Sequence, residues 1–383
     1  MNELFLNIKR AQRLIRVINF NPRSDFGPLC LDVAVTSRCN HKCIFCAAHS
    51  CLKEDTEKTE ELDRDVLENL LEDCVTLGVR EIVFAGNGEP LLYKGLPDII
   101  SRYGEKIDIR MLTNGSTLDM ITEDIFAKIG KLTISMNSIK AETHRLVHGY
   151  AGAEQFSRIK KNIERCLKLP NACRKIAINY VICKDNLAEF PELLRLAQRW
   201  DLYFAIRPMS PMSKVMEERT LSFSDIETVK EELGRLKKES LSQRMLATVQ
   251  QAESACNISE SRINNSDALR PCYFGFYWGN IWSNGDYAQC TYDGNSVLGN
   301  LKKARFKDIW KRQETQAKLY AAALMNVSET PVYASCKGCT GMQVNSVAFH
   351  NVFKRIPFQR SLLKLRAGKV KPYWLQIIKK SWW

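Results

Sequence analysis

Three cysteines lie close together near the start of the chain, at Cys39, Cys43 and Cys46, in the spacing C-x3-C-x2-C. Thiolates at this spacing can hold three irons of a [4Fe–4S] cluster, and the C-x3-C-x2-C motif itself contains no fourth cysteine to hold the last iron. A cluster that lacks one protein ligand keeps one iron open to an exogenous molecule. The spacing therefore predicts a cluster that binds a small molecule directly.

A zinc site, or a set of scattered buried thiols, is the alternative interpretation of the same residues. Zinc requires a fourth ligand nearby, and His41 or His49 could supply it, so the spacing alone leaves this alternative open.

A second group of cysteines lies in the last third of the chain, at Cys272, Cys290, Cys336 and Cys339. The C-x2-C pair at its end is a typical clamp on a metal, and the distant pair completes four thiolates. Four protein ligands leave no open iron, so such a cluster would transfer electrons or stabilise the fold. Structural zinc is again the alternative. No cysteine follows Cys339, which excludes a further cluster of this kind.

The elements that must position these cysteines alternate between strands and helices from residue 31 to about residue 209. Apolar runs predict six strands: 31–37, 80–85, 108–113, 132–137, 176–183 and 203–209. Helical patterns fall between them: 63–77, 96–103, 121–129, 155–167 and 189–200. Six such units predict an α/β fold with a parallel sheet covered by helices. The first cysteine group directly follows the first strand, at the usual functional end of a β/α barrel.

The cysteine spacing, the aromatic Phe45 before the last cysteine and the preceding strand resemble the radical S-adenosylmethionine (radical SAM) enzymes. The resemblance implies that the open iron binds SAM, and that the reduced cluster cleaves SAM to a 5′-deoxyadenosyl radical. It also implies a partial (β/α)6 barrel and a reductant of the flavodoxin or ferredoxin type.

Several strand ends extend the resemblance. The run from Gly86 to Pro90 is similar to the GGEP stretch of the family, with Asn87 where glycine is usual. Past the fourth strand, His148 stands where the family has arginine, and Arg145 lies three residues earlier. The resemblance implies the following SAM-binding residues: Phe45, Gly86, Asn87, Gly88, Glu89, Asn114, Ser135, Arg145, Asn179 and Arg207.

The C-terminal cysteines and the run between them resemble the SPASM/Twitch auxiliary-cluster domains of radical SAM enzymes, and fit the four-cysteine Twitch form best. The resemblance implies an auxiliary [4Fe–4S] cluster bound by these four cysteines. No acid, base or hydrogen donor can be assigned. His144, His148, Tyr292 and Asp293 are candidates because they lie at predicted strand ends or beside a cluster ligand.

Composition bounds the class of protein. The 383 residues contain 14 cysteines, no long apolar run and no signal-peptide pattern, which predicts a cytoplasmic protein. The net charge of +13 is concentrated at the end, where residues 341–383 contain nine Lys or Arg and no acid. This basic, aromatic tail favours an acidic partner, with a peripheral membrane contact as the minority interpretation and no nucleic-acid module recognised.

These patterns predict five segments and a function. Residues 1–30 form a basic amphipathic segment, 31–215 the partial barrel, 216–270 a helical linker with a loop over 257–267, 271–341 the auxiliary domain and 342–383 the tail. We expect SAM cleavage followed by two-electron oxidation of a sugar- or aminocyclitol-like carbon, with the auxiliary cluster as electron acceptor. A peptide-modifying enzyme is the main alternative, although only about 30 residues precede the first strand, too few for a peptide-recognition domain. A non-catalytic, metal-stabilised binding protein is the alternative from another class.

Overall fold

The fold is that of a computed structural model, which divides into two compact units. We call residues 34–61 and 83–264 the barrel unit, and residues 1–33, 62–82 and 265–383 the C-terminal unit. The division falls within β2 (Glu81–Phe84). The described residues are 26–46, 50, 59–149, 153–210, 214–263, 272–290 and 296–323.

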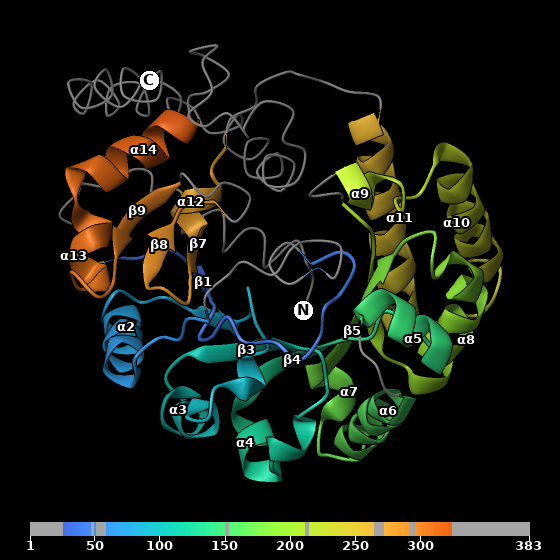
Figure 1. The fold of residues 1–383 in the computed structure, drawn as a ribbon, viewed down its shortest axis with the longest axis horizontal. Helices are drawn as coiled ribbons and strands as arrows, with labels where there is room; N and C mark the ends of the chain where they lie inside the picture. The colour runs from blue at the N-terminus through green and yellow to red at the C-terminus, as the bar shows by residue number, and fades with distance from the viewer. Residues whose placement is uncertain are drawn as a thin grey trace. The chain divides into compact units, whose positions relative to one another are not determined.

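The barrel unit contains parallel strands that alternate with helices along the chain. Its strands lie in the order β6-β5-β4-β3, with bounds β3 (Asp108–Thr113), β4 (Ile129–Ser135), β5 (Ile176–Ile182) and β6 (Tyr203–Pro208). Helix α3 (Leu96–Tyr103) precedes β3. The helices between the four strands are α4 (Glu123–Lys128), α5 (Ala141–His148), α6 (Ala153–Leu167), α7 (Ala172–Lys175) and α8 (Phe190–Trp200), as Figure 1 shows. This arrangement confirms the predicted α/β class and is consistent with a partial barrel.

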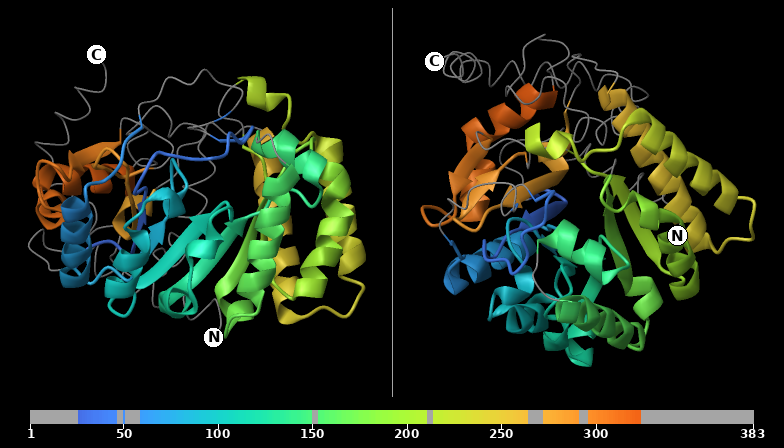
Figure 2. Two further views of the ribbon diagram at one scale, coloured as in Figure 1. Left: turned by 60° about the horizontal axis from the view of Figure 1, so that its bottom comes forward. Right: turned by 45° about the vertical axis from the view of Figure 1, so that its right-hand side comes forward.

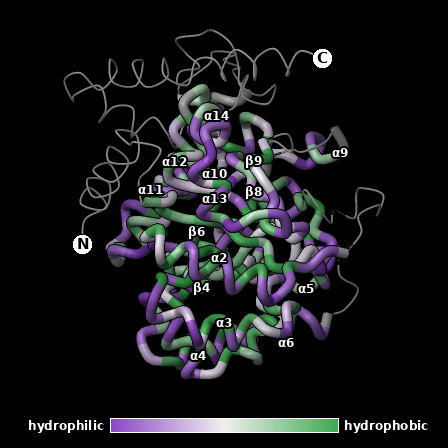
Figure 3. The backbone as a smooth tube through the Cα atoms, turned by 90° about the vertical axis from the view of Figure 1, so that its left-hand side faces the viewer, coloured by the Kyte–Doolittle hydropathy of each residue, from purple (hydrophilic) through white to green (hydrophobic). Residues whose placement is uncertain are grey.

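The two faces of these strands differ in polarity, because side chains alternate across a strand. One face is fully buried and apolar, as at Ile134 and Ile178. Hydrophobic and hydrophilic residues also alternate along the helices, visible in α3 and α6 of Figure 3, which is typical of helices that cover one side of a sheet. The opposite face of the strands is only partly buried and more polar, as at Lys131 and Thr133.

The open edge at β6 is covered by a long helix. Helix α10 (Phe223–Leu236) is followed by α11 (Gln243–Ile263), which runs beside β6 in Figure 2. The Phe204 backbone N–H donates to Oγ1 of Thr248 at 3.0 Å, and the Ile206 N–H donates to Oε1 of Gln251 at 2.8 Å. Side chains of α11 therefore pair with backbone N–H groups at the edge of β6, which would otherwise be available to hydrogen-bond another strand.

The C-terminal unit is built on a smaller set of strands. Its strands lie in the order β1-β7-β8-β9, with bounds β1 (Cys30–Val33), β7 (Trp278–Ile281), β8 (Asp286–Ala288) and β9 (Val297–Asn300). Its helices are α2 (Arg64–Thr76), α12 (Phe274–Tyr277), α13 (Phe306–Lys311) and α14 (Gln313–Ala323). Strands β7 to β9 are antiparallel, whereas β1 and β7 are parallel.

Helices α2 and α13 of this unit are joined by an ion pair. Asp73, whose side chain is only 2% exposed, accepts from Nε and Nη2 of Arg305 at 3.0 and 2.7 Å. Arg305 also donates to Oδ1 of Asn69 at 2.7 Å. The bidentate geometry fixes α13 against α2.

The predicted strands all occur, but some helical segments were not predicted. Helix α5 was not predicted, and the predicted loop over 257–267 is wrong for Asn257–Ile263, which continue α11. The predicted N-terminal helix and the basic tail lie outside the described residues. Among the residues that the structure describes, no helix is long and apolar enough to cross a membrane.

Candidate metal centre at the cysteine loop

The loop from Cys39 to Cys46, here called the cysteine loop, belongs to the barrel unit and is fixed by the C-terminal end of α5. The Lys42 N–H donates to the carbonyl oxygen of His148, and the Ile44 N–H to that of Val147, each at 3.0 Å. The last carbonyl groups of a helix have no partner within it, so they are available to bind a neighbouring loop. Gly149 follows in the left-handed conformation, at φ 58°, and a Cβ there would lie 2.4 Å from the Lys42 oxygen.

An apolar anchor secures the middle of the cysteine loop. Ile44 is 1% exposed and packs in a cluster with Val147 and Cys183, against which the Phe45 ring also packs. The Cys46 N–H donates to the Cys43 oxygen at 3.0 Å, so the second and third cysteines lie on one tight turn. Phe45 therefore stabilises the loop through its packing.

The first cysteine is fixed from the end of β3. Nδ2 of Asn114 donates to Oδ1 of Asn40 at 2.8 Å and lies 4.0 Å from Sγ of Cys39. Nδ2 of Asn40 in turn donates to Oγ of Ser116 at 2.9 Å. The Asn114 amide thus contacts the cysteine loop, and its predicted contact with SAM stays a prediction.

The glycines that follow β2 allow two backbone segments to approach closely. Gly86 has φ 125°, a backbone conformation that residues other than glycine rarely adopt. A Cβ on Gly88 would lie 2.3 Å from the Thr36 oxygen and 2.5 Å from the Arg38 oxygen. The Gly86–Pro90 segment thus packs on the residues that lead into Cys39, while Asn87 is exposed.

Glu89 connects this segment to β3. Its buried carboxylate accepts from Oγ1 of Thr113 at 2.6 Å, from the Asn114 N–H at 2.7 Å and from the Leu91 N–H at 3.2 Å. Burial raises the pKa of Glu89 to about 7, against which these three donors act. In the described structure Glu89 aligns the end of β3 with the cysteine loop.

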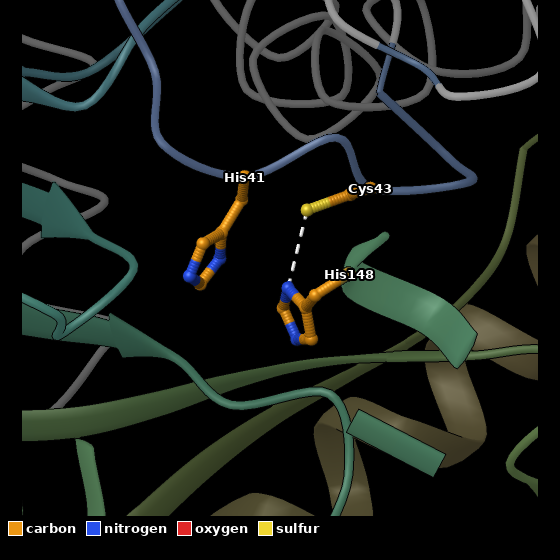
Figure 4. Close-up of side chains that lie close together, drawn as sticks. All are labelled: His41, Cys43 and His148. Carbon is orange, nitrogen blue, oxygen red and sulfur yellow. Dashed lines mark hydrogen bonds between the residues drawn. The ribbon is translucent and has the colours of Figure 1, made fainter. Parts of the chain in front are cut away.

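Three buried histidines pack together at the cysteine loop: His41 belongs to the loop, and His144 and His148 belong to α5. Sequence reasoning did not foresee these histidines as a group. The rings of His144 and His148 are stacked with centroids 4.3 Å apart, and His41 meets His148 edge-on at 5.0 Å. Nδ1 of His148 lies 3.1 Å from Sγ of Cys43, the contact drawn in Figure 4. Burial lowers the pKa of His41 and of His144 to about 4 and that of His148 well below 6.5, so all three rings are neutral near pH 7.

The donor set of the loop fits an iron–sulfur cluster. None of the three cysteines is joined in a disulfide, and all three are partly accessible on one short loop. Burial raises the pKa of the Cys39 thiol to about 11, and a bound metal ion offsets this because its charge stabilises a coordinating thiolate. One ring nitrogen of His41, one of His148 and the sulfur of Cys43 lie within 4.8 Å of one another. These three atoms could supply some of the ligands of a zinc ion, so the zinc alternative stays open at this point.

The partly buried face of the barrel strands gathers three of the predicted SAM-binding residues. Ser135, the last residue of β4, is the register partner of Asn179 in the middle of β5. Asn179 pairs with Ala205, and Arg207 lies two residues beyond on the same face of β6. Alternation in the sequence could not assign this side. Arg145 is exposed on α5, and its predicted role in SAM binding stays a prediction.

The auxiliary cysteines are described only in part. Cys272 precedes α12, where its N–H donates to the Ala322 oxygen at 2.9 Å, and Cys290 follows β8, where its N–H donates to Oγ of Ser296 at 3.1 Å. The turn between β7 and β8 uses Gly285 at φ 89°. Cys336, Cys339, Tyr292 and Asp293 lie outside the described residues, so this ligand set stays a prediction.

Comparison with known families settles the class of the chain. Residues 33–197 match the radical SAM superfamily, and residues 272–340 match SPASM, an iron–sulfur cluster-binding domain. The chain therefore contains a radical SAM domain followed by a SPASM domain. Radical SAM enzymes carry a [4Fe–4S] cluster and SAM, and the SPASM match implies auxiliary iron–sulfur binding, which confirms the predicted cofactors.

Individual relatives are distant. The chain is 30% identical over 215 residues to GTP 3′,8-cyclase of Rhizobium leguminosarum bv. trifolii, covering 54% of this chain and 58% of the relative. It is 27% identical over 235 residues to GTP 3′,8-cyclase of Chlorobaculum tepidum, covering 60% and 67%. The chain thus spans about three-fifths of the length of the first of these relatives.

Solved structures support the fold alone. SuiB of Streptococcus suis bound to its precursor peptide SuiA matches with a TM-score of 0.54 at 16% identity, covering 81% of this chain and 70% of that one. The structure of anSMEcpe with bound SAM matches with a TM-score of 0.54 at 16% identity, covering 89% and 100%. Both proteins share the architecture that the strands of the barrel unit adopt here.

Two site residues carried no signal that a single sequence could reveal. Asn137 contacts the ring of His148, and its role depends on β5 lying beside it. His148 was noted as a departure from the family pattern and as a candidate acid, base or hydrogen donor. Its contact with Cys43 was not foreseen, because it requires α5 to end at the cysteine loop.

Proposed function

We propose that Cys39, Cys43 and Cys46 hold the SAM-binding cluster of an enzyme that oxidises a sugar- or aminocyclitol-like carbon by two electrons. The observation that carries the proposal is the construction of the cysteine loop. Backbone contacts from α5, an apolar anchor at Ile44 and the Asn114 amide fix all three cysteines within one unit. A site prepared in this way suits a cofactor that must stay in one place.

When bound, the cluster and SAM supply a primary carbon radical that takes a hydrogen atom from a substrate C–H bond. The protein supplies position, charge and exclusion of water. Ser135, Asn179 and Arg207 share one face of the sheet and offer hydrogen-bonding groups to SAM or to substrate. Lys131 and Thr133 extend this polar face along β4, which favours a substrate rich in hydroxyl groups over an apolar one.

The second electron determines whether the net reaction is an oxidation. An alcohol carbon that has lost a hydrogen atom becomes a carbonyl when it gives one further electron to an acceptor and one proton to a base. Four thiolates at Cys272, Cys290, Cys336 and Cys339 would close the auxiliary site to substrate, which leaves electron transfer or stabilisation of the fold, and the proposed oxidation uses electron transfer. An external reductant of the flavodoxin or ferredoxin type supplies the electron that SAM cleavage consumes.

The test is a substrate panel with the reconstituted enzyme under anaerobic conditions. Aminocyclitols and sugars, short peptides and GTP are each supplied, and 5′-deoxyadenosine and product mass are measured. We expect an aminocyclitol or sugar to raise 5′-deoxyadenosine formation and to yield a product that has lost two hydrogens. A modified peptide, or a cyclised nucleotide, would replace this proposal with the corresponding activity.

A cysteine variant tests the role of the auxiliary site. Cys272→Ala should still cleave SAM but lose the oxidised product, because the second electron has no acceptor. Cys74→Ala removes a fully buried thiol from α2 of the same unit and should retain both reactions. Oxidised product at the wild-type yield in Cys272→Ala would contradict the assigned acceptor.

A further inference from the structure

The hydrogen bonds around His148 fix which of its ring nitrogens carries the proton. The Val181 N–H donates to Oδ1 of Asn137 at 2.7 Å. A backbone N–H can only donate, so this contact identifies the oxygen of the Asn137 amide and turns its NH2 group toward the histidine. Nδ2 of Asn137 lies 3.4 Å from Nε2 of His148, and the amide therefore donates to Nε2.

A neutral imidazole carries one N–H, so an Nε2 that accepts requires the proton on Nδ1. That nitrogen lies 3.1 Å from Sγ of Cys43. Figure 4 shows the ring of His148 directed at this sulfur across a single contact. The chain of donors thus runs from β5 through Asn137 and the histidine to the second cysteine of the loop.

The same pattern distinguishes a hydrogen-bond donor from a metal ligand. A histidine that binds a metal through Nδ1 carries its proton on Nε2 and donates it to a carboxylate, a carbonyl or water. Here Nε2 faces the NH2 group of Asn137, which has no lone pair to accept such a proton. The surroundings of His148 therefore match an Nδ1–H donor and oppose its use as a zinc ligand.

We propose that His148 is a positioning residue that donates an Nδ1–H hydrogen bond to the Cys43 thiolate of the SAM-binding cluster and raises the reduction potential of that cluster. The proposal rests on the proposed assignment of Cys43 as a cluster ligand. Hydrogen bonds to cluster sulfurs tune reduction potential, and a donor stabilises the more electron-rich reduced state.

The contact also anchors the cysteine loop by two atoms of one residue. The His148 carbonyl oxygen accepts from the Lys42 N–H at 3.0 Å, while its ring reaches the sulfur of the next residue, Cys43. The residue is 1% exposed, with the Asn137 amide at Nε2 of its ring and the Cys43 sulfur at Nδ1. A side chain fixed on both sides keeps the donor in line with the sulfur in both oxidation states.

An isosteric pair of variants isolates the donor from the shape of the side chain. His148→Asn places an amide N–H at the position of Nδ1, and His148→Leu places methyl groups there, so both variants leave the same space. We expect His148→Leu to shift the midpoint potential of the SAM-binding cluster to a more negative value and His148→Asn to restore much of the shift. His144→Leu is the control, because its Nδ1 pairs with Oγ of Ser138 and not with a cysteine.

The readout is a redox titration of the full-length, reconstituted protein followed by electron paramagnetic resonance, with iron and zinc measured on each sample. The wave that disappears in Cys43→Ala identifies the SAM-binding cluster. Equal potentials for His148→Leu and wild type, or an equal shift in His144→Leu, would overturn the inference while leaving the cluster in place. Absence of any iron wave that depends on Cys43 would overturn the proposed function itself.

A measurement on the wild-type protein avoids the effects of substitution on folding. With ¹⁵N-histidine incorporated, electron–nuclear resonance of the reduced cluster should show one weakly coupled nitrogen, as expected for an N–H···S contact. A strong coupling would indicate direct ligation by histidine, and no coupling would indicate that the ring does not face the cluster. Either of the latter two results would contradict the proposed donor.

Discussion

Replacing Gly88 by alanine tests the close approach on which the cysteine loop depends. The added Cβ would lie 2.3 Å from the Thr36 oxygen and 2.5 Å from the Arg38 oxygen. Carbon and oxygen atoms that are not bonded rarely come within 3.0 Å, and both oxygens belong to backbone that cannot rotate away. The Gly86–Pro90 segment or residues 36–38 must therefore move.

The size of the effect follows from opposing terms. Overpacking a well-packed site costs about 1–3 kcal/mol, and contact with backbone on both sides favours the upper part of that range. Replacing glycine by alanine also restricts the unfolded chain, which stabilises the folded state by about 0.4–1 kcal/mol. We expect a net loss of about 2 kcal/mol in the free energy of unfolding, and reduced iron incorporation because Cys39 follows the displaced residues.

Gly234→Ala is the matched control. Gly234 lies within α10 and a Cβ there meets no atom within 4 Å, so alanine should stabilise this helix by about 0.5–1 kcal/mol. In urea unfolding, the free energy of unfolding should fall in Gly88→Ala and rise in Gly234→Ala. The iron content should fall in Gly88→Ala alone. Wild-type stability and iron content in Gly88→Ala would refute the packing argument.

Three further predictions concern other parts of the fold. Arg305→Ala should lower the free energy of unfolding by about 1.5–3 kcal/mol, because the buried Asp73 loses two charge-assisted hydrogen bonds and retains only the longer contacts with Lys307. Arg158→Ala, at the exposed pair with Asp119, should cost under about 1 kcal/mol, and equal effects in urea unfolding would contradict the burial argument. Burial raises the pKa of Glu89 to about 7 from 4.5, so between these values the folded chain keeps a proton that the unfolded chain has lost, and stability falls as pH rises through that range by up to about 3 kcal/mol. Glu89→Gln removes this contribution. The free energy of unfolding, measured from pH 4.5 to 8, should therefore decline less steeply in the variant than in wild type, and parallel curves would contradict the raised pKa. Thr248→Val leaves the Phe204 N–H without its acceptor and should cost about 1–3 kcal/mol, against a small change for Thr228→Val on the exposed side of α10, with hydrogen exchange at Phe204 as the direct readout.

The sequence predicted those parts of the fold that depend on local patterns. The apolar run of β5 and the amphipathic pattern of α3 indicate their elements without reference to partners, and α3 occupies the predicted residues. Helix α5 was missed because it is short and its buried positions include two histidines, His144 and His148, so that it lacks an apolar stripe. The polar α11 was partly missed because its role is to satisfy edge amides of β6, a contact between distant segments.

In the candidate site, too, the local features could be predicted from the sequence and the contacts between distant segments could not. The cysteine spacing is a local feature, and it predicted the cofactors that the family match confirms. The roles of individual neighbours depend on contacts across the fold. The contact of Asn114 with Asn40 and the contact of Asn137 with the ring of His148 were not predicted from the sequence. Spacing identifies ligands, whereas the residues that orient ligands are identified only when the strands are placed side by side.

The central claim is that the cysteine loop carries a cluster with one iron open to SAM. Iron and acid-labile sulfide, together with 5′-deoxyadenosine formation, should be measured anaerobically on wild type and on Cys43→Ala. We expect about eight irons and SAM cleavage in wild type, and about four irons with no 5′-deoxyadenosine in the variant, because only the auxiliary cluster remains. Bound zinc without iron, or SAM cleavage that persists in Cys43→Ala, would contradict the claim.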